Sequence, residues 1–109
     1  MDHTYQTCVD ACVKCAIACD YCASACLNEE DVNIIARCIQ LDLECATMCR
    51  TAVQLMSLRS EHASTVCQLC ADVCSACAEE CSRHDMEHCR ECAEACRVCA
   101  EECASMAAA

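Results

Sequence analysis

Cysteine and apolar side chains recur along the chain at alternating steps of three and four residues. Steps of three and four place side chains on one stripe of a helix, in the a/d pattern by which helices pack together. Three clusters, at 28–31, 57–60 and 82–85, interrupt this pattern and divide the chain into four segments. The pattern therefore predicts four helices, at approximately residues 2–27, 31–57, 60–83 and 86–106.

The four segments are rich in Ala, Glu, Gln, Leu and Met, which favour helices. Asp31, Ser60 and Asp85 stand at the start of the second, third and fourth segments, where their side chains suit N-cap positions. Connections this short make neighbouring helices antiparallel. The sequence therefore predicts an all-α fold, an antiparallel up-down four-helix bundle that forms a single domain over residues 1–109.

Cysteine occupies most of the predicted inward positions and accounts for 19 of the 109 residues. If successive helices form hairpins, cysteines of neighbouring helices lie at equal heights, as Cys15 does with Cys45 and Cys70 with Cys99. The predicted interior is therefore a tube lined with thiols. It comprises Cys8, Cys12, Cys15, Cys19, Cys22 and Cys26 in the first segment, Cys38, Cys45 and Cys49 in the second, Cys67, Cys70, Cys74, Cys77 and Cys81 in the third, and Cys89, Cys92, Cys96, Cys99 and Cys103 in the fourth.

The composition removes several other classes of protein. Although 57% of the residues count as apolar, 19 of them are Cys and 19 are Ala, so little remains for an ordinary core. Without Gly, Pro, Phe or Trp, a β-sheet is disfavoured and a Gly-rich nucleotide loop cannot form. The net charge of −11 argues against nucleic acid or an anionic membrane surface as a partner. No apolar run is long enough to span a membrane.

The first residues lack the charged-then-apolar arrangement of a signal peptide, so we expect a cytosolic protein. Thiols stay reduced in the cytosol, and dense cysteine there indicates metal binding rather than disulfides. The odd number of cysteines points the same way, since full pairing would leave one thiol over.

Charge favours Cu(I) over zinc as the metal. Metal replaces the thiol proton, so one Cu(I) for each proton leaves the charge of the core unchanged. Each Zn²⁺ held by four thiolates would instead leave about two negative charges, which are costly to bury. If each thiolate bridges two Cu(I) ions, the capacity is on the order of 19 ions, one for each Cys.

Three other hypotheses remain open at this point. The chain could be a metallothionein-like buffer for Zn²⁺ or Cd²⁺, or its cysteines could simply fill the core as small hydrophobic groups. It could also be a thiol redox protein, although its Cys-x-x-Cys pairs lie in mid-helix, away from the helix N-terminus that activates such thiols. We find no partnered nucleophile, so we predict that the chain is not an enzyme.

Two segments and the Cys stripes together resemble a known family. The segment Cys-Ile-Gln-Leu-Asp-Leu-Glu-Cys-Ala-Thr-Met-Cys at 38–49 and the turn His-Asp-Met-Glu-His-Cys at 84–89 are similar to the cytosolic branch of the bacterial copper storage proteins. The resemblance covers essentially the whole chain. It implies a bundle filled with many Cu(I) ions and assembled as a homotetramer. A copper chaperone or chelator is then a candidate partner for delivery and release.

One end of the predicted tube is polar. Beyond the last cysteines, the inward positions there are Glu29, Ile35, His84 and Asp85, with His88 beside them. We predict that copper enters at this end, with His84 and His88 as capture ligands, and the resemblance implies an entrance His near this turn. The alternative is that both histidines are solvated turn residues.

The other end is apolar, since its inward positions are Tyr5, Met56 and Met106. We interpret these side chains as a plug, although Met is also a soft ligand that could bind Cu(I) and open this end instead. His3 and His62 lie near this end and are expected to face solvent.

The second helix departs from the Cys pattern at Asp42. A carboxylate is a poor Cu(I) ligand, so Asp42 is expected either to accept a hydrogen bond from a thiol or a neighbouring helix, or to reach water. Further apolar side chains on this helix, such as Ile39, Leu43 and Val53, lie outside the predicted seam. They are expected to form an oligomer interface or, alternatively, to pack within the monomer.

Overall fold

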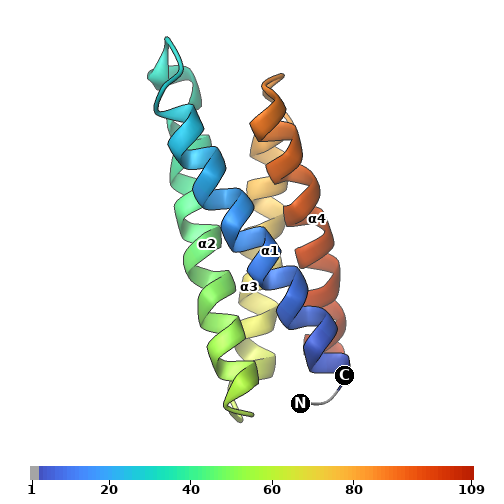
Figure 1. Cartoon of the computed structure of the whole chain (residues 1–109). Helices are drawn as coiled ribbons and strands as arrows, with labels where there is room; N and C mark the ends of the chain where they lie inside the picture. Colours follow the sequence, from blue (N-terminus) through green and yellow to red (C-terminus); the bar gives the residue numbers. More distant parts are fainter. Residues whose placement is uncertain (1–2) are drawn as a thin grey trace.

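The computed structural model describes the backbone of residues 3–109 and the side chains from residue 5 onward. Its helices run antiparallel, so that α1 begins and α4 ends at the same end of a rod of 44 × 18 × 18 Å (Figure 1). This confirms the predicted all-α four-helix bundle. The helices are α1 (His3–Cys26), α2 (Ala36–Ser57), α3 (Ala63–Cys81) and α4 (Glu87–Ala108), with a short 3₁₀ helix, η1 (Val32–Ile35), before α2.

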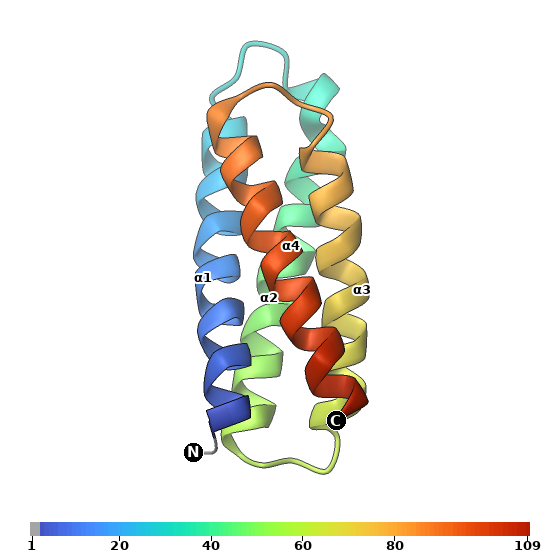
Figure 2. The same cartoon turned by 90° about the vertical axis from the view of Figure 1, so that its right-hand side faces the viewer.

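The helices form a square in cross-section. Helix α1 packs against α2 and α4, and α3 packs against the same two helices (Figure 2). Helices α1 and α3 therefore lie on a diagonal. The hairpins α1–α2 and α3–α4 follow from the short connections, but the contact of α1 with α4 joins segments from opposite ends of the chain.

Two of the predicted N-caps are wrong. Helix α3 begins at Ala63, and the hydroxyl of Ser60 instead accepts a hydrogen bond from the His62 amide at 3.0 Å, in the turn before the helix. Helix α4 begins at Glu87 without a side-chain cap, and Asp85 is exposed. The cap at Asp31 is present, where the carboxylate accepts from the Asn33 amide at 3.1 Å, but it begins η1 rather than α2.

Helix α2 ends without the glycine that most helices use to turn away. Arg59 takes the left-handed conformation, with φ of 54°. The Ser60 amide donates to the Leu55 carbonyl at 2.9 Å and the Arg59 amide donates to the Met56 carbonyl at 3.1 Å, which is the Schellman motif. These bonds satisfy two carbonyls at the helix end and offset the strain of a non-glycine residue in this region.

The interior consists mostly of sulfur. All 19 cysteines are free and buried, with exposed fractions of 0–1%. Buried alanines, such as Ala46 and Ala71, fill the space between them, while Ile35 and Met56 close the core near its two ends. Among the residues described, no helix is long and apolar enough to cross a membrane.

Candidate metal site

The cysteines of α1 and α4 form a zigzag of sulfur atoms along the axis of the bundle. Cys12 Sγ lies 3.5 Å from Cys103 Sγ and 3.6 Å from Cys99 Sγ. The same alternation reaches the far end, where Cys26 Sγ lies 3.8 Å from Cys89 Sγ. The adjacency of α1 and α4 therefore joins the cysteine stripes of these two helices into one continuous column of thiols.

The three cysteines of α2 connect this column to α3. Cys38 Sγ lies 3.3 Å from Cys81 Sγ near one end of the bundle. Near its centre, Cys45 Sγ lies 3.4 Å from Cys74 Sγ and 3.7 Å from Cys15 Sγ. The cysteines of α2 thus add contacts between the column and α3, which also meet directly in the group of Cys19, Cys77, Cys92 and Cys96.

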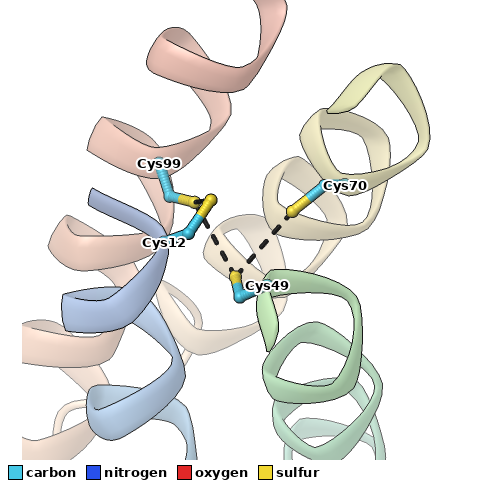
Figure 3. Close-up of side chains that lie close together, drawn as sticks. All are labelled: Cys12, Cys49, Cys70 and Cys99. Carbon is cyan, nitrogen blue, oxygen red and sulfur yellow. Dashed lines mark hydrogen bonds between the residues drawn. The ribbon is translucent and has the colours of Figure 1, made fainter. Parts of the chain in front are cut away.

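One group of four thiols takes a cysteine from each helix (Figure 3). Cys49 Sγ lies 3.8 Å from Cys70 Sγ and 3.7 Å from Cys99 Sγ, which is itself 3.6 Å from Cys12 Sγ. All four sulfurs lie within 4.8 Å of one another. The equal heights predicted for Cys70 and Cys99 agree with this group.

Neighbouring groups of thiols share members. Cys49 and Cys99 recur in a second group of four, and Cys15 belongs both to that group and to a third. A sulfur shared between groups must bridge two ions when both groups are filled, and bridging thiolates suit Cu(I), which binds two or three soft ligands. Further groups include Cys15/Cys49/Cys74/Cys99, Cys15/Cys19/Cys45/Cys96, Cys19/Cys77/Cys92/Cys96 and Cys22/Cys26/Cys38/Cys89.

Burial keeps protons on the thiols near the end that holds the 82–86 turn. Loss of solvation raises the pKa of Cys26 to about 11, and it also raises the pKa of Cys89. Hydrogen bonds from Cys22 and Cys81 have the opposite effect on Cys38, whose pKa is lowered, and nearby His84 lowers it further. A metal that binds here must displace protons from buried thiols, so soft-metal affinity has to exceed that cost.

Asp42 occupies the one inward position of α2 between Cys38 and Cys45, and its side chain is fully buried. Its Oδ1 accepts hydrogen bonds from the thiols of Cys77 and Cys92, both at 3.2 Å. The expectation that Asp42 bonds to thiols is therefore confirmed, and the alternative that it reaches water is wrong. Burial, as the main cause, raises the pKa of Asp42 to about 8.

The raised pKa of Asp42 predicts that the metal-free protein loses stability as the pH rises from about 5 to 7. The native state keeps the proton of Asp42 up to about pH 8, whereas the unfolded chain releases it near pH 4. The contribution of this proton to the stability of the folded state is therefore complete below about pH 4 and is lost as the pH rises to about 8. The slope should approach 1.4 kcal/mol per pH unit, about one proton. Denaturant unfolding of the reduced protein at several pH values measures it.

The matched variants for this measurement are Asp42→Asn, which should flatten the slope, and Glu44→Gln. Glu44 lies on the same helix but is exposed, where its carboxylate accepts a hydrogen bond from Gln40 at 3.0 Å. If Asp42→Asn kept the full slope of the unmodified chain, the proton would belong to another group.

His84 lies at the end of the bundle predicted to be the entrance. Its Nε2 is 3.0 Å from Oε2 of Glu80, and both side chains are largely buried, with 12% and 9% exposed. A surface pocket of about 360 Å³ opens beside it and is lined by Glu29, Ile35 and Asp85, among others. His84 is therefore largely buried beside this pocket and held by Glu80, rather than solvated in the turn.

His88 is half-buried in the first turn of α4. Its Nε2 is buried and has no hydrogen-bond partner in the described part of the chain. A buried imidazole nitrogen without a partner is costly, which is consistent with a group that awaits a ligand. By contrast, the side chain of His62 is 74% exposed, as expected, and the side chain of His3 lies outside the described residues.

The opposite end carries the predicted apolar side chains. Met56 is fully buried, while Tyr5 and Met106 are partly buried against the core. The Arg59 guanidinium lies 5.9 Å from the centre of the Tyr5 ring and covers this end. The burial of Met56 favours its interpretation as packing.

Sequence reasoning missed Glu80. It is buried although charged, and it contacts both His84 and the guanidinium groups of Arg37 and Arg83. Glu80 stands four residues before His84, the spacing at which side chains meet on a helix. That spacing could have identified it, but Glu79 and Glu80 are adjacent and only the fold shows which one faces inward.

Some apolar side chains of α2 pack within the monomer, and others are exposed, as an oligomer interface would require. Leu41 is buried, and Ile39 and Val53 pack partly against the core of the monomer. Leu43, however, is 51% exposed, and Ile17 on the neighbouring helix α1 is 62% exposed. An oligomer interface on this face remains a prediction.

Comparison with known proteins supports the identification of the buried thiols as a copper site. The family model described as copper storage protein matches residues 1–108. A metal-free structure of copper storage protein 3 from Bacillus subtilis is 45% identical, with a TM-score of 0.87 over 94% of this chain and 97% of that one. A Cu(I)-bound structure of the copper storage protein BsCsp3 is also 45% identical, with a TM-score of 0.93 over 96% and 99% of the two chains.

A third structure shows copper loading to a cytosolic copper storage protein from Streptomyces lividans. It is 40% identical to this chain, with a TM-score of 0.94 over 97% of this chain and 93% of that one. The match of the family model over nearly the full length confirms the resemblance that the Cys stripes indicated. This chain, a four-helix bundle with a continuous interior of thiols, belongs to the copper storage protein family.

Proposed function

We propose that this chain sequesters many Cu(I) ions in its interior, on the order of one for each cysteine. Copper storage is the function of the family to which it belongs, and the related BsCsp3 is known in a Cu(I)-bound form. The observation that carries the proposal is the series of buried thiol groups along the axis, four of which share sulfurs with a neighbouring group. Isolated zinc sites of four thiolates would not need such sharing. The number of Cu(I) ions bound at saturation tests the proposal.

All 19 cysteines are proposed as ligands. The bridging scheme requires each thiolate to lie near at least two possible ion positions, and the sulfur contacts of 3.3–4.0 Å along the axis support it. Exchange of a proton for Cu(I) at each sulfur keeps the interior neutral. Asp42 takes no copper in this scheme, because its carboxylate is a hard ligand.

His84 and His88 are proposed as the first ligands at the entrance. His84 lies within the 82–86 turn and His88 in the first turn of α4, where its buried Nε2 has no partner among the described residues. Cys26 and Cys89, the nearest thiols to this end on α1 and α4, hold their protons firmly because of burial. A neutral imidazole can bind Cu(I) before a thiol has lost its proton, so it can act as an intermediate ligand.

The double variant His84→Ala/His88→Ala should take up Cu(I) from a chelated donor more slowly, on the order of tenfold, because the first ligands are lost. Its final capacity should not change, since no thiol is removed. Stopped-flow mixing of the reduced protein with the Cu(I)–chelator complex measures the rate. His62→Ala is the matched control, because His62 is exposed and lies at the opposite end. Equal rates in all three proteins would assign entry elsewhere.

The wider setting of this chain follows from the same proposal. We expect a single domain that acts in the cytosol, as the Streptomyces lividans relative is described, and that assembles as a homotetramer. A copper chaperone or chelator would deliver and remove the ions. We expect no catalytic turnover, and activity of the reduced protein toward a disulfide substrate would contradict that expectation.

A further inference from the structure

Glu80 divides its carboxylate between two kinds of partner. Its Oε1 faces two guanidinium groups, with Arg83 Nη1 at 3.4 Å and Arg37 Nε at 3.5 Å. Its Oε2 lies 3.0 Å from Nε2 of His84. Because α3 ends at Cys81, Glu80 holds a histidine that lies just beyond the helix, in the turn to α4.

A carboxylate can only accept hydrogen bonds, so the short contact requires that His84 Nε2 carries the proton. In the neutral ring, Nδ1 is then the nitrogen with a free lone pair. In the described part of the chain, Nδ1 of His84 has no hydrogen bond to a side chain or backbone group beside the contact of Nε2 with Glu80. The contact with Glu80 therefore selects which nitrogen of His84 can bind a metal.

We propose that Glu80 is a positioning residue for copper capture, which holds the Nε2–H of His84 and thereby presents Nδ1 to incoming Cu(I). This inference rests on the proposed role of His84 as an entrance ligand. Histidines that bind metals commonly donate their other ring N–H to a carboxylate, which fixes the tautomer and makes the ligand more basic. Nδ1 gives its lone pair to Cu(I), while the proton on Nε2 stays in the bond to Glu80, so no proton has to leave the ring.

A purely structural role for Glu80 would depend on the arginines instead. The side chains of Arg37 and Arg83 are 69% and 63% exposed, so water and salt screen their attraction to Glu80. The contact with His84 is shorter and more buried, so it is the one expected to order a side chain. The two roles differ in what they predict for the His84 ring.

The direct test is the tautomer of His84 in the reduced, metal-free, full-length protein, read from its ring ¹⁵N chemical shifts by NMR. The unmodified chain should show the form protonated at Nε2. Glu80→Ala should move His84 toward a mixture of tautomers. Glu80→Gln should retain the original form, because its amide oxygen can still accept the bond. A ring protonated at Nδ1 in the unmodified chain would overturn the proposal, even if Glu80→Ala failed to fold.

The second test is the rate of Cu(I) uptake from a chelated donor. Glu80→Ala should slow uptake, on the order of tenfold, with unchanged final capacity, and Glu80→Gln should restore most of the rate. Glu79→Ala is the matched control, since Glu79 is exposed and pairs with Arg83 at 3.3 Å. Added to His84→Ala, the Glu80→Ala change should have no further effect, because Glu80 acts through His84.

The results for these variants distinguish the positioning role of Glu80 from the entrance role of His84. If His84→Ala alone loads copper at the normal rate, the entrance role of His84 is wrong. If His84→Ala is slow but Glu80→Ala is normal, His84 captures copper and the positioning role of Glu80 is wrong. Additive effects in the double variant would also overturn that role, since they would show that Glu80 acts independently of His84.

Discussion

Titration of the fully reduced chain with Cu(I), in competition with a coloured chelator, should reach saturation at about 19 ions per chain. The physical reason is that every one of the 19 cysteines is buried beside other sulfurs, so each thiolate can bridge two ions. Removal of one layer of thiols by the variant Cys12→Ala/Cys49→Ala/Cys70→Ala/Cys99→Ala should lower the capacity by about four ions. Saturation at four or fewer ions in the unmodified chain would contradict storage.

Zinc provides the control for metal identity. A buffer built for Zn²⁺ would bind about one ion for every four thiols and would keep it when Cu(I) is offered. We expect Cu(I) to displace Zn²⁺, because the thiolate-bound zinc would leave negative charge in an interior without cations. Zinc that remains in the protein after addition of excess Cu(I) would favour the metallothionein-like alternative.

Loading with Cu(I) should raise the unfolding temperature of this chain by more than about 20 °C. The metal-free interior consists mostly of thiols and alanines, which bury less apolar surface than leucines would. An ion present at about a hundred times its dissociation constant adds about 2.7 kcal/mol per independent site, and the sites here are many. In a domain of this size, about 1 kcal/mol shifts the midpoint by several degrees. Thermal unfolding followed by circular dichroism, without oxygen, measures the shift.

The dependence on thiols can be checked in the same experiment. The variant that lacks Cys12, Cys49, Cys70 and Cys99 should gain less stability from copper, because one layer that joins all four helices is absent. A chelator that strips the copper should return the unfolding temperature of the unmodified chain to its metal-free value. A copper-loaded protein that melts at the metal-free temperature would show that the ions lie outside the core.

The candidate ligands could be predicted from the sequence because their signal is local. Alternating steps of three and four residues place Cys8 to Cys26 on one helical stripe whatever the rest of the chain does. Hairpin connections then relate heights within α1–α2 and α3–α4, as Cys15 and Cys45 show. The resemblance to copper storage proteins rested on the same repeated positions and was confirmed over nearly the full chain.

The helix starts were predicted less well. Ser60 and Asp85 are good N-cap residues, but neither caps a helix here. The Ser60 hydroxyl is used in a turn before α3, and α4 begins at Glu87 after the extended Met86. Cap preferences contribute only about 1 kcal/mol, so the packing of the buried stripes decides where each helix begins.

The sequence by itself determined the four helices, their inward faces and the soft-metal chemistry, because helical periodicity and ligand type are properties of short stretches of chain. Only the tertiary structure decided which stripes meet across the bundle: α1 lies against α4, so that Cys12 lies beside Cys103. It also placed Asp42 among thiols of other helices and turned Glu80 rather than Glu79 toward His84. The contacts of α1 with α4 and of Asp42 with its thiols join residues far apart in the chain, which no local pattern records. The contact of Glu80 with His84 has a local spacing, but it depends on the rotation of a helix end.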